Sequence, residues 1–160
     1  NYSVIQPSHY KPKPRVAVGL DTSGSMGGFY EGSPLYEAVC EVEGIAKGTG
    51  AEIEVLDVDC SANASQIQAV CTAKGMKLRG HGGTDMRVPV EVFRARKANR
   101  PDVLVILTDG ETPWPAYKPK EFKVIIGLVG NPSKSTIDAC PAWAKVIVIS
   151  QDDKKTKRKK

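Results

Sequence analysis

Oxygen-bearing side chains are concentrated in three short segments of the chain, and their types suit the binding of a metal ion. The first segment places Asp21, Ser23 and Ser25 at alternate positions, among glycines that permit a tight turn. The second carries Thr84 in a glycine-rich stretch, and the third carries Asp109 directly after an apolar run. Carboxylates and hydroxyls without sulfur are ligands for hard cations. The set therefore predicts one site for a divalent cation, Mg²⁺ before Mn²⁺ or Ca²⁺.

Buried strands are expected to position these segments. The apolar run Arg15–Leu20 leads into Asp21, and the nearly all-apolar run Asp102–Leu107 leads to Asp109. Strands that are apolar throughout are typical of a parallel sheet covered on both faces. Ligands gather at the carboxyl ends of the strands in such sheets. The segments converge if these two strands are neighbours.

The remaining pattern predicts helices between the strands. Ser33 and Pro34 indicate an N-cap and first helical turn, and apolar residues then recur at helical spacing up to Gly48 and Gly50. A second helix is predicted over Met86–Ala98. Further strands are predicted at Ala51–Val58, Gln66–Thr72, Lys123–Val129 and Ala144–Ile149, with a short helix near Ser133–Ala139. The alternation predicts an α/β fold with a mostly parallel sheet, in which Gln66–Thr72 forms an antiparallel edge strand.

Composition predicts one globular domain between polar ends. We expect a Pro-containing lead-in at 1–14, a folded domain at 15–150 and a basic tail at 151–160. No apolar run approaches the ~18 residues of a membrane span, and no secretory signal is visible. None of the four cysteines forms a CxxC pair, which argues against a zinc ribbon. Because the chain does not look small, loop-rich or secreted, we expect free thiols in a cytoplasmic protein, with a disulfide between Cys60 and Cys71 as the alternative.

The net charge of +5 comes from the C-terminal tail. Six of the 23 Lys and Arg residues lie in Lys154–Lys160, which leaves 17 basic against 18 acidic residues elsewhere. The folded part therefore lacks the composition of a nucleic-acid-binding module. Association with nucleic acid is expected through the tail alone, and a solvated end or linker is the other interpretation of the tail.

The three segments resemble the metal-ion-dependent adhesion site of von Willebrand factor A (VWA) domains. Asp21-Thr-Ser-Gly-Ser25 resembles the family's DxSxS signature, Gly83-Thr84-Asp85 resembles its threonine segment, and Thr108-Asp109-Gly110 resembles its third element. The order of the segments agrees with the family, over about residues 15–150. The amino-acid sequence of these segments is most similar to that of the intracellular bacterial and phage branch of the family. This branch includes the VWA-like domain of predicted metallopeptidase-like proteins linked to MoxR-type ATPases.

The resemblance implies a Rossmann-like, three-layer fold and a module for protein–protein interaction. It implies that Ser23, Ser25 and Thr84 are direct ligands, whereas Asp21 and Asp109 act mostly through water. It also implies that an Asp or Glu of a partner completes the metal shell. An AAA+ ATPase and a domain of the same full-length chain are candidate partners, and no membrane partner is expected.

The loops flanking the segments carry residues suited to a partner-binding rim: Phe29, Tyr30, Glu111 and Trp114. The aromatic side chains have the alternative of folding back onto apolar surface. The insert Gly27–Gly32 and the proline-rich stretch after Asp109 depart from the family pattern. These departures bear on the partner more than on the metal.

Each metal-site residue also has a purely structural interpretation. Asp21, Ser23 and Ser25 suit a capped, glycine-rich turn, Thr84 suits a helix N-cap, and Asp109 suits an Asx-turn. Catalysis is not expected, because the chain lacks the P-loop and HExxH motifs and has no recognisable pair of nucleophile and base. A metal-dependent hydrolase is the alternative function. His81, three residues before Thr84, is the one imidazole near the segments.

Overall fold

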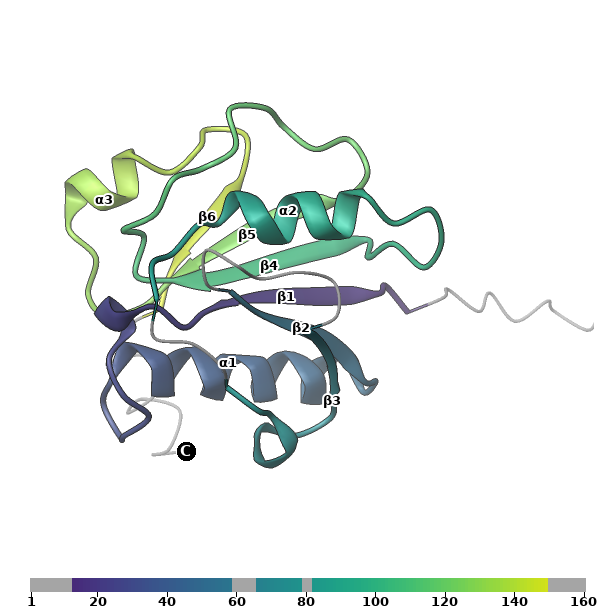
Figure 1. The fold of residues 1–160 in the computed structure, drawn as a ribbon, viewed down its shortest axis with the longest axis horizontal. Helices are drawn as coiled ribbons and strands as arrows, with labels where there is room; N and C mark the ends of the chain where they lie inside the picture. Colours follow the sequence, from purple (N-terminus) through teal and green to yellow (C-terminus); the bar gives the residue numbers. More distant parts are fainter. Residues whose placement is uncertain (1–12, 59–65, 79–81, 150–160) are drawn as a thin grey trace, which may run out of the picture.

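Six strands form one sheet in the order β3-β2-β1-β4-β5-β6 (Figure 1). The computed structural model describes residues 13–58, 66–78 and 82–149. All neighbouring strands are parallel except β3, which pairs antiparallel with β2 at the edge. The strands are β1 Val16–Asp21, β2 Ile53–Val58, β3 Ile67–Val70, β4 Val103–Thr108, β5 Lys123–Leu128 and β6 Lys145–Val148. The predicted α/β fold, mostly parallel with an antiparallel edge strand, is confirmed.

Two helices cover opposite faces of the sheet (Figure 1). Helix α1, Pro34–Thr49, packs on the face that bears Val18 and Leu20 of β1. Helix α2, Arg87–Arg94, packs on the face that bears Leu104 and Ile106 of β4. Alternating residues of one strand thus enter two separate apolar clusters, because successive side chains point to opposite faces. The result is three layers, as expected.

A glycine lets α2 approach the sheet closely. An added Cβ at Gly19 would lie 3.0 Å from the Cβ of Pro89 in α2. Pro89 occupies the first helical turn, where its missing N–H removes no intrahelical hydrogen bond. The absence of a side chain at Gly19 therefore allows α2 to pack this close to β1.

The first helix begins and ends at the predicted residues. Ser33 is the N-cap, and its Oγ accepts a hydrogen bond from the Tyr36 N–H at 3.1 Å. Gly50 is the C-cap and adopts the left-handed conformation with φ of 60°. A short helix, α3, follows β5 at Lys134–Asp138, close to its predicted position. The 3-10 turns η1 Gly24–Met26 and η3 Ala73–Gly75 lie in loops.

The predicted extent of the second helix is wrong. It ends at Arg94 instead of Ala98, and Ala95, which lies within the predicted range, is exposed. Beyond the helix, Arg96 forms an ion pair with Glu54 of β2 at 2.6 Å, and Asn99 has a left-handed φ of 52°. A left-handed residue cannot continue a right-handed helix. Beyond Arg94 the chain therefore contacts β2 instead of continuing the helix.

Several sequence-based expectations fall outside the described residues. These include most of the lead-in, the basic tail, His81 and Cys60. Cys40, Cys71 and Cys140 all have free thiols. Cys71 is exposed, whereas Cys40 and Cys140 are half-buried. In the part of the chain that the structure describes, no helix is long and apolar enough to cross a membrane.

Candidate metal centre

Asp21 lies at the centre of the predicted site. It ends β1, and none of its surface is exposed. Its Oδ1 accepts hydrogen bonds from the Ser23 N–H and the Thr84 hydroxyl, both at 2.9 Å. Its Oδ2 accepts a hydrogen bond from the Thr108 hydroxyl at 2.6 Å. A buried carboxylate is thereby surrounded by donors from three segments of the chain.

The sheet register explains why Asp21 meets Thr108. β1 and β4 are parallel neighbours, and Leu20 is paired with Leu107, so the next residues of the two strands lie side by side. Thr108 is two residues beyond Ile106 and four beyond Leu104 along β4, so its side chain points to the same face, which α2 covers. Thr84 lies in the segment that leads into α2 on the same face. The two strands are thus neighbours, and the segments that carry Asp21 and Thr84 meet at their carboxyl ends.

The serine segment forms a tight turn beside Asp21. The hydroxyls of Ser23 and Ser25 lie 3.1 Å apart across η1, and fully buried Met26 anchors the turn in the core. The hydroxyl of Thr22 donates to the carbonyl of Val58 at 3.2 Å, which ties the turn to the end of β2. The two serine hydroxyls are thus held close to one point.

Asp109 is less closely joined to the others. Its Oδ1 accepts a hydrogen bond from the Glu111 N–H at 3.0 Å. This contact forms the Asx-turn that the sequence offered as a purely structural role for Asp109. Among the described contacts, none links its carboxylate to Asp21, Ser23, Ser25 or Thr84. Asp109 is nevertheless next to Thr108, whose hydroxyl also accepts from the Gly110 N–H at 3.0 Å. Its half-buried carboxylate therefore lies in the same turn as a member of the cluster.

Thr84 does not cap the following helix, so that alternative is wrong. The N-cap position is Met86, and the Met86 N–H donates to the hydroxyl of Thr112 at 3.0 Å. Thr112 and Thr108 are the two residues that sequence reasoning missed at this site. Thr108 is the last residue of β4 and belongs to the Thr108-Asp109-Gly110 segment, whereas nothing in the sequence distinguishes Thr112.

Asp85 is engaged outside the cluster. The Arg87 guanidinium donates to both carboxylate oxygens, with Nε–Oδ1 at 2.9 Å and Nη2–Oδ2 at 2.7 Å. These side-chain hydrogen bonds lower the pKa of the Asp85 carboxyl below its usual value. Asp85 is therefore a loop carboxylate already neutralised by Arg87.

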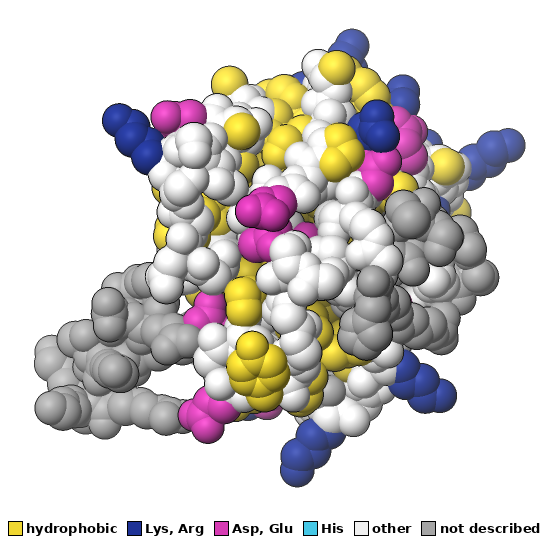
Figure 2. Space-filling model, turned by 60° about the vertical axis from the view of Figure 1, so that its left-hand side comes forward, with side chains coloured by type: hydrophobic (Ala, Val, Ile, Leu, Met, Phe, Trp, Pro, Cys, Tyr) yellow, Lys and Arg dark blue, Asp and Glu magenta, His cyan; other side chains and the backbone are white. Residues whose placement is uncertain are grey.

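The proposed rim residues divide by exposure. Phe29 and Tyr30 are 58% and 63% exposed, and Glu111 is also exposed. Trp114 is half-buried and packs on the α2-side cluster, with its indole N–H buried and lacking a partner among the described residues. Figure 2 views the molecule toward this end, with acidic side chains near the middle and Lys and Arg at the margins.

The donor set fits a hard cation better than a soft one. The cluster offers one buried carboxylate, a second half-buried carboxylate nearby, and hydroxyls from Ser23, Ser25 and Thr84. Within the described residues, no group of three or more His, Cys, Asp or Glu side chains is placed to hold a metal ion. A site here would therefore depend on hydroxyl oxygens, which suit Mg²⁺ and similar ions.

The sheet order and the oxygen-rich turns at its carboxyl end define a Rossmann-like α/β domain. The family model described as VWA-like domain (DUF2201) matches residues 16–150, and the chain belongs to this family. No curated protein matches the chain. The VWA-like part of the predicted resemblance is confirmed.

Proposed function

We propose that the domain is a metal-dependent protein-interaction module with an adhesion-type site around Asp21. One observation carries this proposal: a fully buried carboxylate accepts hydrogen bonds from Ser23, Thr84 and Thr108, which come from three separate segments. Burying an ionised group is costly unless its partners compensate for lost water. A site with so many oxygens at one sheet end is well suited to a small cation.

The residues would bind the ion in two different ways. The hydroxyls of Ser23, Ser25 and Thr84 would hold the ion directly, while Asp21 and Asp109 would balance its charge, mostly through water. Mg²⁺ suits this set, because it prefers oxygen ligands and keeps waters in its shell. When bound, the ion supplies a positive centre that attracts a carboxylate of a partner.

The partner is proposed to be another protein that contributes Asp or Glu. Exposed Phe29 and Tyr30 belong to the insert after the serine turn, and exposed Glu111 belongs to the loop after β4. Large exposed aromatics favour protein contact. An AAA+ ATPase of the MoxR type, or a domain of the same full-length chain, remains the proposed source of the carboxylate.

A binding role is favoured over catalysis. The described cluster consists of hydroxyls and carboxylates, and the sequence carries no recognised hydrolase motif. The Ser23 and Ser25 hydroxyls contact each other, and the Thr84 hydroxyl donates to Asp21. Because the Asp21 carboxylate accepts from three donors at once, this arrangement favours holding oxygens in place over activating one nucleophile. We therefore propose a cytoplasmic binding protein without enzymatic activity.

Calorimetric titration with Mg²⁺ and Mn²⁺ tests the proposal. The wild-type chain is expected to bind one ion, and Asp21→Ala and Thr84→Ala to bind at least about tenfold more weakly. Thr72→Ala is the matched control, because Thr72 is exposed and belongs to the loop after β3. Circular dichroism of each variant checks that it is folded. Absent binding in the wild type, or equal binding in all four proteins, refutes the site.

A further inference from the structure

The loop after β4 is hydrogen-bonded to the segment that carries Thr84. The Met86 N–H donates to the hydroxyl of Thr112 at 3.0 Å, and that hydroxyl donates to the carbonyl of Pro113 at 3.3 Å. Met86 is fully buried at the N-cap of α2, two residues after Thr84. Because a buried N–H without a partner is costly, the Thr112 hydroxyl stabilises the segment in this position.

This contact closes a ring of hydrogen bonds around the proposed metal centre. Asp21 accepts from the Thr84 hydroxyl at 2.9 Å and from the Thr108 hydroxyl at 2.6 Å. From Thr108 the chain continues through the turn after β4 to Thr112. The contact between Thr112 and Met86 then leads back to Thr84. Among the described hydrogen bonds, the other link between these two segments passes through Asp21.

The turn inside this ring carries two carboxylates proposed to act on the metal or on its partner. Asp109 precedes Thr112 by three residues, and its Oδ1 accepts from the Glu111 N–H at 3.0 Å. Glu111, a proposed rim residue, directly precedes Thr112. A loop that is fixed at Thr112 has little freedom to move either carboxylate relative to Thr84.

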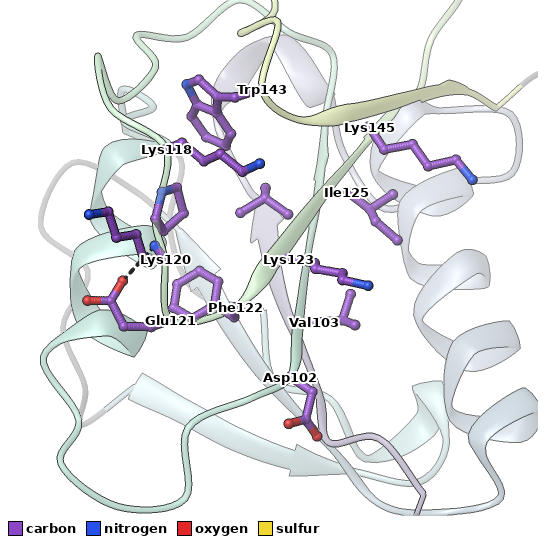
Figure 3. Close-up of a pocket in the computed structure, with 12 residues that line it drawn as sticks. Asp102, Val103, Lys118, Lys120, Glu121, Phe122, Lys123, Ile125, Trp143 and Lys145 are labelled. Carbon is purple, nitrogen blue, oxygen red and sulfur yellow. Dashed lines mark hydrogen bonds between the residues drawn. The ribbon is translucent and has the colours of Figure 1, made fainter.

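The far end of the same loop is attached to α2 by separate contacts. The Tyr117 hydroxyl donates to the Glu91 carboxylate. Arg94 forms an ion pair with Glu121 at 3.2 Å, and Figure 3 shows Glu121 where the loop leads into β5. None of these contacts involves the segment that precedes α2. The two ends of the loop can therefore be tested independently.

We infer that Thr112 is a positioning residue of the metal centre, which keeps Asp109 and Thr84 at the separation that one ion requires. This inference rests on the proposed function, since it concerns the same site. Because its hydroxyl accepts from Met86 and donates to Pro113, Thr112 acts through the loop and not as a ligand. Removing a group that orients metal ligands typically lowers metal affinity by about 10–100-fold, although the group does not touch the ion.

Calorimetric titration of the full chain with Mg²⁺ and Mn²⁺ tests this role in three variants. Thr112→Val keeps the shape and removes the hydroxyl, and is expected to bind the ion at least about tenfold more weakly than the wild type. Thr112→Ser restores the hydroxyl and should recover most of the affinity. Tyr117→Phe is the matched control, because it removes a hydroxyl from the other end of the same loop, and it should bind as the wild type does. Unchanged affinity in Thr112→Val, or an equal loss in Tyr117→Phe, overturns the inference.

Amide hydrogen exchange in EDTA gives a second readout that needs no metal. In Thr112→Val the Met86 N–H should lose more protection than the N–H of Ile106, a buried residue of β4 whose exchange reports unfolding of the whole domain. Equal losses at the two positions show that Thr112 supports only global stability, and overturn the inference. Absence of metal binding in the wild type refutes the proposed function and the positioning role with it. Binding by the wild type with unchanged affinity in Thr112→Val refutes the positioning role alone.

Discussion

The hydroxyl of Thr108 donates a 2.6 Å hydrogen bond to Oδ2 of Asp21, across the boundary between β4 and β1. The same hydroxyl oxygen accepts from the Gly110 N–H at 3.0 Å. One side chain thereby fixes the orientation of a buried carboxylate and the start of the turn that carries Asp109. The two carboxylate-bearing segments of the proposed metal centre are therefore coupled through Thr108.

Replacing Thr108 should expose this coupling in the stability of the domain. Thr108→Val keeps the shape but leaves the Asp21 carboxylate with one donor fewer, so we expect a loss of about 1.5–3 kcal/mol. Thr108→Ser keeps the hydroxyl and should recover most of the loss. Urea denaturation measures both variants without added metal. Thr72→Val, at an exposed position, serves as control and should change stability by less than about 0.5 kcal/mol. Equal stability of the Val and Ser variants at position 108 would contradict this role.

Gly110 should tolerate no side chain. Its φ is 91°, and an added Cβ would lie 2.5 Å from Cγ2 of Thr136 in α3. Gly110→Ala therefore combines backbone strain with overpacking, and we expect a loss of at least about 2 kcal/mol. Adding Thr136→Ser removes the clashing methyl group and should restore part of the stability. Denaturant titration of the single and double variants measures the recovery.

A glycine in open space provides the contrast. Gly44 lies in α1, and an added Cβ there meets no atom within 4 Å. Gly44→Ala should stabilise the domain by up to about 1 kcal/mol, because alanine favours helix. If Gly110→Ala were as stable as Gly44→Ala, the inference that α3 packs closely against the Thr108–Gly110 turn would be wrong.

The features predicted correctly from the sequence are those that depend on local patterns. The all-apolar run before Asp109 identified a central parallel strand, and Ser33 with Pro34 identified the start of α1. The donor to Asp21 from Thr108 was not predictable in the same way, since the two residues are 87 positions apart and meet only through sheet register. Pattern alone does not determine which strands become neighbours.

The end of α2 shows the same limit for a helix. The predicted helix extended to Ala98, because the sequence carries no helix-ending signal between Arg94 and Ala98. The ion pair between Arg96 and Glu54 is a tertiary contact with β2, and it belongs to the segment where the chain leaves the helix. Local helix propensity therefore does not by itself determine where α2 ends.

Cysteine reactivity should separate two thiols. Burial raises the pKa of the Cys140 thiol. At neutral pH a smaller fraction of Cys140 is therefore thiolate than in a cysteine with the ordinary pKa. Its Sγ also donates to the carbonyl of Thr136 at 3.5 Å. We expect iodoacetamide at neutral pH to modify exposed Cys71 first and Cys140 much more slowly, with the rate at Cys140 rising as pH increases. Peptide mass spectrometry measures both rates. Denaturation in urea should remove the difference, and failure to label Cys71 in the native protein would indicate a disulfide there.

Asp21→Asn separates the structural role of the carboxylate from its proposed role toward a metal. The amide oxygen can still accept from the Ser23 N–H and from Thr84, and the Thr108 hydroxyl can rotate to accept from the amide nitrogen. The metal-free variant should therefore lose only about 1 kcal/mol. The negative charge that would balance a cation is lost, however. Because a ligand that binds only the folded state raises its stability, the wild-type Tm should increase with Mg²⁺ concentration. The Tm of Asp21→Asn should stay constant from EDTA to millimolar Mg²⁺ in a thermal melt. An equal rise in both proteins would place any Mg²⁺ binding away from Asp21, while a large loss of metal-free stability would show that the carboxylate is needed for the fold itself.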